Sequence, residues 1–158
     1  MALQSCYWSK DRSTKVFCII VGPDREIRST GYNGMPRGVN DDIKERHERP
    51  MKYLYFEHAE RNAIFNASRM GVPLLGCTLY VVSVPQSFPP CAECARAIIQ
   101  AGIVRVVYGA SEVPERWKDS CNAAMAMFNE ARVVVEAVDL NCLKDESQEG
   151  KTYESFAG

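Results

Sequence analysis

The sequence predicts an α/β fold, a three-layer α/β/α sandwich with a central five-stranded mixed sheet. Five short apolar runs rich in β-branched residues alternate with segments of helical periodicity. The first two runs are joined by a turn and are expected to form a hairpin, whereas helical segments separate the later ones. The order α-β-β-α-β-α-β-α-β therefore indicates helices packed on both faces of one mixed sheet.

The first third of the chain contains a helix and the hairpin. Residues 2 to about 9 predict a short helix with Leu3, Cys6 and Tyr7 on one face. The continuous apolar run 16–21 is typical of a strand buried on both faces. A turn leads to a second strand over 27–32. Residues 39–53 are strongly charged, so a solvated loop or a short helix is expected there.

The remaining elements alternate between helix and strand. A helix is expected to open at His58, because alanines follow at near-helical spacing until Gly71 and Pro73 stop it. Apolar β-prone runs predict strands, and amphipathic periodicity predicts helices. In order, these are a strand at 77–84, a helix at 91–102, a strand at 104–108, a helix at 115–131 and a strand at 133–138.

The whole chain has the composition of one ordinary globular domain. It has 158 residues, 46% hydrophobic and 25% charged, and we assign residues 1–143 to the domain. The polar tail 144–158 is expected to be partly disordered or to dock on a neighbouring subunit through Tyr153 and Phe156.

The charge and cysteine content exclude several classes of partner. The net charge of -1 and the absence of a basic stripe argue against nucleic acid. No apolar run approaches a membrane span, and the N-terminus lacks the pattern of a signal peptide. Seven cysteines with no disulfide framework favour a reducing compartment, so a cytoplasmic location is expected.

The motif that carries chemistry has two parts, His58-Ala59-Glu60 and Pro90-Cys91-Ala92-Glu93-Cys94. Two thiolates and one imidazole give Zn2+ three protein ligands and leave the fourth position open to water. We therefore expect His58, Cys91 and Cys94 to hold zinc, which acidifies that water. Glu60, two residues from the histidine, is placed to act as general acid and base.

Two plainer interpretations of the same residues exist. A C-x-x-C pair is also found in redox proteins and in structural zinc clips. A structural site needs a fourth protein ligand, and the other five cysteines are scattered singly. They are expected to be small buried hydrophobes. The catalytic zinc site is therefore the favoured interpretation.

A glycine-rich loop over residues 31–38 is the second candidate for a functional segment. Three glycines and a proline in eight residues predict a tight loop with Asn33 aimed at a ligand. An ordinary exit from the hairpin would have the same composition. Arginine suits phosphate through its planar fork, and the candidates near the loop are Arg12, Arg37, Arg46 and Arg49.

Several stretches together resemble the deoxycytidylate (dCMP) deaminase family of the cytidine deaminase-like superfamily. H-x-E followed by P-C-x-x-C is the signature of zinc-dependent nucleobase deaminases. The resemblance covers roughly residues 9 to 110 and rests on 9–11 (S-K-D), 31–38 (G-Y-N-G-M-P-R-G), 41–42 (D-D), 58–64 (H-A-E-R-N-A-I) and 91–103 (C-A-E-C-A-R-A-I-I-Q-A-G-I).

The resemblance implies a function and a set of roles. The reaction would be hydrolytic deamination of dCMP to dUMP and ammonia, by hydroxide attack on C4 with Glu60 as proton shuttle. Asn33 would contact the nucleotide, and the backbone N–H of Ala59 would meet the pyrimidine carbonyl. The resemblance also implies a homo-oligomer, a dimer or hexamer, and regulation by dCTP and dTTP.

The chain departs from the family pattern at the expected substrate pocket. Relatives usually carry V-G-A in the first strand, where this chain has Val16-Phe17-Cys18, so Phe17 and Cys18 are expected beside the base. Relatives place a tyrosine after the fourth strand, whereas residues 111–114 contain no aromatic. Phe88, in a longer loop before the cysteines, and Arg37 are the further expected substrate contacts.

Other functions remain open from the sequence. The same chemistry on a free base or modified nucleotide, such as cytosine or guanine, would keep the zinc motif. A non-catalytic zinc-binding scaffold would keep the fold, although Glu60 argues against it because a structural metal needs no unliganded carboxylate.

Overall fold

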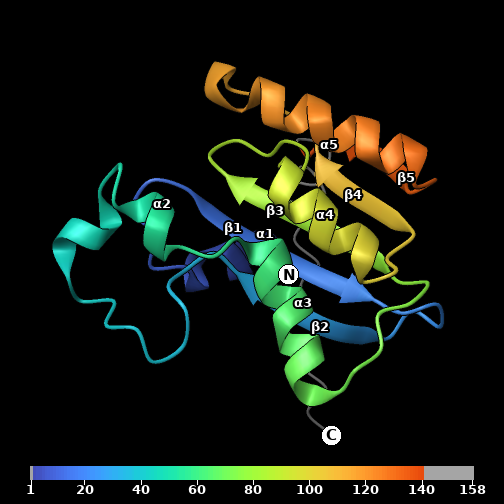
Figure 1. Ribbon diagram of the computed structural model, residues 1–158, viewed down its shortest axis with the longest axis horizontal. Coiled ribbons are helices and arrows are strands. Elements are labelled where there is room, and N and C mark those ends of the chain that lie inside the picture. Colours follow the sequence, from blue (N-terminus) through green and yellow to red (C-terminus); the bar gives the residue numbers. More distant parts are fainter. Residues whose placement is uncertain (1, 141–158) are drawn as a thin grey trace, which may run out of the picture.

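The computed structural model describes residues 2–140, which build one mixed five-stranded sheet in the order β2-β1-β3-β4-β5 (Figure 1). β1 pairs antiparallel with both β2 and β3, and β3, β4 and β5 run parallel. This arrangement confirms the predicted mixed sheet. The strands are β1 (Lys15–Val21), β2 (Ile27–Tyr32), β3 (Thr78–Val84), β4 (Arg105–Gly109) and β5 (Val134–Val138).

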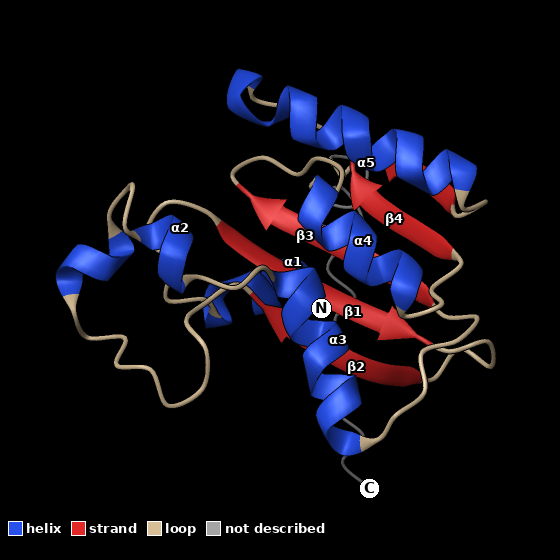
Figure 2. Cartoon of the chain, viewed as in Figure 1, coloured by secondary structure: helices blue, strands red, loops and turns tan. Residues whose placement is uncertain are grey.

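Helices cover both faces of the sheet, which confirms the three-layer sandwich (Figure 2). One face is covered by three longer helices, α3 (Ala59–Met70), α4 (Ala92–Gln100) and α5 (Lys118–Glu130). The inner residues of these three helices form one core with β1, β3 and β4. On the other face lie α1 (Ala2–Ser5) and the 3-10 turn η1 (Cys6–Trp8).

Alternation along β1 separates the two layers. Cys18 and Ile20 are fully buried in the core beneath the helices. Phe17 points to the opposite face, where its ring meets Trp8 edge-on with 5.4 Å between centroids. The predicted burial of this strand on both faces is thus observed, with η1 as the second cover.

α3 begins and ends where the sequence predicts. His58 has extended φ and ψ and precedes the first helical residue, and Gly71 closes the helix in the left-handed conformation at φ 67°. β2 lies directly against this helix. A Cβ atom on Gly31 would come within 2.4 Å of the Ala59 carbonyl oxygen and of the Ala63 nitrogen, so only glycine permits this approach.

The charged segment forms an arm that projects from the sheet (Figure 1). Paired backbone bonds between Gly34 and Glu57 close its base. The arm contains the 3-10 turn η2 (Lys44–His47) and the short helix α2 (Lys52–Tyr55). A short helix was one of the two expectations for this segment.

Two predicted helices differ in part from the structure. Tyr7 is 69% exposed, because the chain tightens into η1 at Cys6 and the helical face that was predicted does not continue. Trp117 ends the 3-10 turn η3 (Glu115–Trp117), so the last helix starts later than predicted.

Among the described residues, no helix is both long and apolar enough to span a membrane. The tail 144–158 lies outside the described residues, and the domain assignment stays a prediction.

Candidate active site

A cavity of about 890 Å³ opens where α3 and α4 begin. His58 directly precedes α3, and Cys91 directly precedes α4. The two helix N-termini therefore meet at this cavity, and their partial positive charges favour anionic groups there. The volume is within the range typical of small-molecule sites.

His58, Cys91 and Cys94 come together beside the cavity, and His58 and Cys91 border it. The Nδ1 atom of His58 lies 3.4 Å from the Cys91 sulfur and 3.3 Å from the Cys94 sulfur. All three potential ligand atoms lie within 4.8 Å of one another. One imidazole and two thiols fit the preferences of Zn2+, and a fourth, non-protein ligand could approach from the cavity that His58 and Cys91 border.

Hydrogen bonds among the three side chains, together with their burial, shift the pKa of each one. Hydrogen bonding from Cys94, followed by that from His58, lowers the pKa of Cys91 to about 4. The hydrogen bond to Cys91 raises the pKa of His58 to about 9. Cys94 is buried and donates to Cys91, so its pKa is raised well above the ordinary value. A thiolate is thus ready at neutral pH, and metal binding displaces the remaining protons.

Glu60 lies in the first turn of α3 and borders the same cavity. Its side chain is almost completely buried, and this burial raises the pKa of the carboxyl group. The group of potential metal ligands does not include it. A carboxyl group with a raised pKa next to a metal site can both accept and donate protons near neutral pH.

Ion pairs around the site link the two helices. The His58 backbone N–H donates to Glu57 Oε1, 3.0 Å away, and the same oxygen lies 3.2 Å from Arg61 Nε. Arg61 also reaches Glu93 in the first turn of α4, at 3.3 Å. The start of α3 is thereby tied to the helix that carries Cys94.

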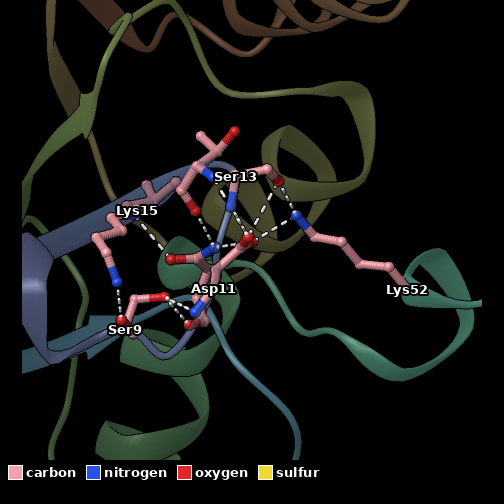
Figure 3. Close-up of polar contacts among 8 residues, drawn as sticks. Ser9, Asp11, Ser13, Lys15 and Lys52 are labelled. Carbon is pink, nitrogen blue, oxygen red and sulfur yellow. Dashed lines mark hydrogen bonds and ion pairs between the residues drawn. The ribbon is translucent and has the colours of Figure 1, made fainter. Parts of the chain in front are cut away.

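A buried polar network forms another wall of the cavity (Figure 3). Asp11 is 2% exposed and lies 2.5 Å from Lys52 Nζ, which also donates to Ser13 Oγ at 2.8 Å. The Asp11 carboxylate further accepts bonds from the backbone N–H groups of Ser13 and Thr14. The network fixes the loop before β1 to the arm that carries α2.

Asn33 borders the cavity, but most of the hydrogen-bonding capacity of its side chain is used within this network. Its Nδ2 donates to Asp11 Oδ2 and to the Thr14 carbonyl, and its Oδ1 accepts from Val16 N–H at 2.8 Å. An amide oxygen has two lone pairs, so one remains for a ligand. Ala59 and Phe88 also border the cavity.

Three expected substrate contacts lie elsewhere. Phe17 points to the opposite face of the sheet, and Cys18 is in the core beneath the site. Arg37 extends over the outside of α3 and bonds to Asn66 Oδ1. None of the three belongs to the cavity lining. Strand alternation moves Phe17 away, because its neighbour Val16 takes the cavity side.

Several cavity residues were missed by the sequence analysis. Trp117 lies just beyond the segment 111–114, in which an aromatic residue was sought. Lys52 and Asp11 meet only through the fold, so no local pattern could reveal them. Cationic side chains at the cavity are Arg49, Lys52, Arg61 and Arg116, of which only Arg49 was among the predicted candidates.

Known proteins are similar to this chain in sequence. The family described as the cytidine and deoxycytidylate deaminase zinc-binding region matches residues 1–110. Deoxycytidylate deaminase of Homo sapiens is 36% identical over 149 residues, which cover 91% of this chain and 79% of that protein. An uncharacterized deaminase in the luxG 3' region of Aliivibrio fischeri is 40% identical over 140 residues, 87% of this chain and 88% of that protein.

A solved structure is similar to the whole sandwich. The dCMP deaminase from the cyanophage S-TIM5, crystallised in complex with dCMP and dUMP, gives a TM-score of 0.67 at 24% identity. The match covers 87% of this chain and 90% of that one. This likeness agrees with the observed sheet order and helix layers.

Proposed function

We propose that this chain, which belongs to the cytidine and deoxycytidylate deaminase family, converts dCMP to dUMP and ammonia. The observation that carries the proposal is the convergence of His58, Cys91 and Cys94 beside the buried Glu60 in one large cavity. Relatives named deoxycytidylate deaminase support the substrate.

The protein is a zinc-dependent aminohydrolase, and His58, Cys91 and Cys94 would hold its metal. When bound there, zinc would make a water molecule acidic enough to act as a nucleophile near neutral pH. The neighbouring residues of this chain hold the ligands in place. Glu93 and Arg61 hold the two helices together, so that the imidazole and thiolates keep their mutual geometry.

Glu60 moves the protons of the reaction. Its carboxylate accepts a proton from the attacking water and donates it to N3 of the ring as the C4–O bond forms. The second water proton then passes through the same carboxyl group to the amino group. The C4–N bond breaks, ammonia leaves, and a carbonyl remains at C4. The Ala59 N–H orients the ring through its 2-carbonyl.

A phosphate on the substrate is supported by two arginines at the cavity that have no carboxylate partner among the described residues. Lys52 and Arg61 form ion pairs with carboxylates, whereas no ion pair among the described residues involves Arg49 or Arg116. A guanidinium group without a carboxylate partner at the edge of a nucleotide-sized cavity is suited to a phosphate.

The assembly and location are part of the same proposal. A homo-oligomer is supported by large apolar side chains that are exposed in α2 and at Met51, the residue before it. Leu54 is 80% exposed, Tyr53 is 51% exposed and Met51 is 44% exposed. A cytoplasmic location is supported by the six described cysteines, which are buried and form no disulfide with one another.

Ammonia release from zinc-loaded protein tests the substrate. We expect dCMP to be preferred over deoxycytidine, cytosine and guanine by at least about tenfold in kcat/KM. Arg49→Gln and Arg116→Gln should reduce this preference, while Arg37→Gln, outside the cavity, serves as the control. Preference for a compound without phosphate would contradict the proposal; preference for cytosine or guanine would favour a free-base deaminase.

A further inference from the structure

A helix that carries no residue of the metal group packs directly against the helix that carries Cys94. α5 lies beside α4 (Figure 1). Ala124 and Phe128 on α5 are completely buried and belong to the same core as Ile98 on α4. α5 is therefore a firmly anchored support from which side chains can act on the metal site.

Two neighbouring residues in the first turn of α5 hold the chain on both sides of Cys91. The Ala92 N–H, directly after Cys91, donates to Ser120 Oγ at 3.0 Å. The Cys121 thiol is buried and donates to the Pro89 carbonyl at 3.5 Å. These two side chains, Ser120 and Cys121, form what we call the α5 clasp. The clasp joins segments that are about thirty residues apart in the sequence.

The start of α4 needs such support because its own residues provide little. Cys91 occupies the N-cap position, where a serine, threonine, aspartate or asparagine oxygen usually accepts a helix N–H. A cysteine has no oxygen for this role, and Pro90 before it has no N–H. The N–H groups of the first helical turn have no partner within the helix, and that of Ala92 has its acceptor on α5.

We propose that Ser120 and Cys121 are positioning residues that fix the Cys91 sulfur within the metal group. That sulfur lies 3.4 Å from His58 Nδ1. Zinc sites in proteins are close to tetrahedral, so a shift of the backbone on either side of Cys91 would weaken metal binding. This inference rests on the metal site of the proposed function and does not depend on which nucleotide or base is the substrate.

A merely structural role for the clasp would lower the stability of the fold and leave zinc affinity unchanged. Ser29 offers a matched control, because its buried hydroxyl donates to the Ala63 carbonyl at 2.7 Å and ties β2 to α3. Phe128→Leu is the second control, since it disturbs the core packing of α5 itself. Neither Ser29 nor Phe128 belongs to the cavity lining or to the metal group.

Transfer of zinc from the loaded full-length protein to a chromophoric chelator measures the affinity of the site. Removing a residue that orients a metal ligand typically weakens metal binding by about 10- to 100-fold. We expect Ser120→Ala to weaken zinc binding about tenfold, and its combination with Cys121→Ala to weaken binding further within that range. Ser120→Thr keeps the hydroxyl acceptor and Cys121→Ser keeps a donor, so both should remain near the wild type.

The two control variants should behave differently from the clasp variants. Ser29→Ala and Phe128→Leu should lower the melting temperature of the zinc-loaded protein and retain wild-type zinc affinity. If they weaken zinc binding as much as Ser120→Ala does, the effect belongs to fold stability and the clasp is refuted.

Cys91→Ser separates failure of the clasp from failure of the metal site. If Cys91→Ser loses zinc affinity while the combined Ser120→Ala and Cys121→Ala variant retains it, the clasp is refuted and the metal site stands. If Cys91→Ser retains wild-type zinc affinity, the metal site falls and the clasp falls with it. Zinc transfer is measured without substrate, so a failure of dCMP deamination would leave a positive result for the clasp standing.

Discussion

Breaking the buried Asp11–Lys52 pair is expected to destabilise the protein strongly. Lys52→Met leaves the carboxylate of Asp11 at 2% exposure without its cation. Removing one partner of a buried pair costs about 3–5 kcal/mol. Asn33 and the loop at 13–14 still donate hydrogen bonds to this carboxylate, so we expect the lower end, about 3 kcal/mol. The melting temperature should fall by about 6–12 °C.

The assay is thermal and urea unfolding at one fixed excess of zinc, because bound metal adds to stability. Lys10→Met is the control, since it removes an exposed pair with Asp41 at 2.7 Å, and exposed pairs contribute little to stability. Asp11→Asn combined with Lys52→Met should be more stable than Lys52→Met alone, because no buried charge is left unpaired. A loss for Lys52→Met no larger than that for Lys10→Met would refute this reasoning.

Three further perturbations test other parts of the structure. Gly31→Ala should destabilise by about 3 kcal/mol or more through backbone overlap with α3, whereas Gly34→Ala, with no atom nearer than 3.8 Å, should be near neutral in urea unfolding. Burial would raise the pKa of Asp11, but the bonds from Lys52 and from the Ser13 N–H outweigh it and the pKa is lowered. The stability that the Asp11 carboxylate contributes should therefore be fully present above pH 3.8 and should be lost as the pH falls through the lower pKa of the folded state. Melting temperatures measured against pH should show this loss in the wild type and not in Asp11→Asn. Chelation of zinc should abolish ammonia release, and stoichiometric zinc should restore it.

The sequence was informative where local chemistry decides the structure. Gly71 ends α3 because the left-handed conformation suits glycine, and a single turn forces β1 and β2 into a hairpin. The proximity of the two cysteines was also predictable, because Cys91 directly precedes α4 and Cys94 lies in its first turn, a spacing that brings the sulfurs together. Period and spacing are local properties and need no knowledge of the tertiary fold.

Other features depend on tertiary packing and escaped prediction. A strand covered on both faces shows no polar alternation, so the sequence did not reveal that Phe17 turns away from the cavity. Trp117 reaches the site because Ser120 anchors its helix to α4, a contact between distant segments. Lys52 meets Asp11 only because the projecting arm returns across the loop before β1.

Ammonia release by the Glu60→Gln variant tests the central claim most directly. Glutamine keeps the size of the side chain but cannot carry a proton, and Glu60 is outside the metal-ligand group. The account predicts that the variant retains wild-type zinc content and loses about 10²- to 10⁴-fold in kcat on dCMP. Wild-type turnover by Glu60→Gln, with zinc bound, would contradict the assignment of Glu60 as proton carrier and with it the proposed mechanism.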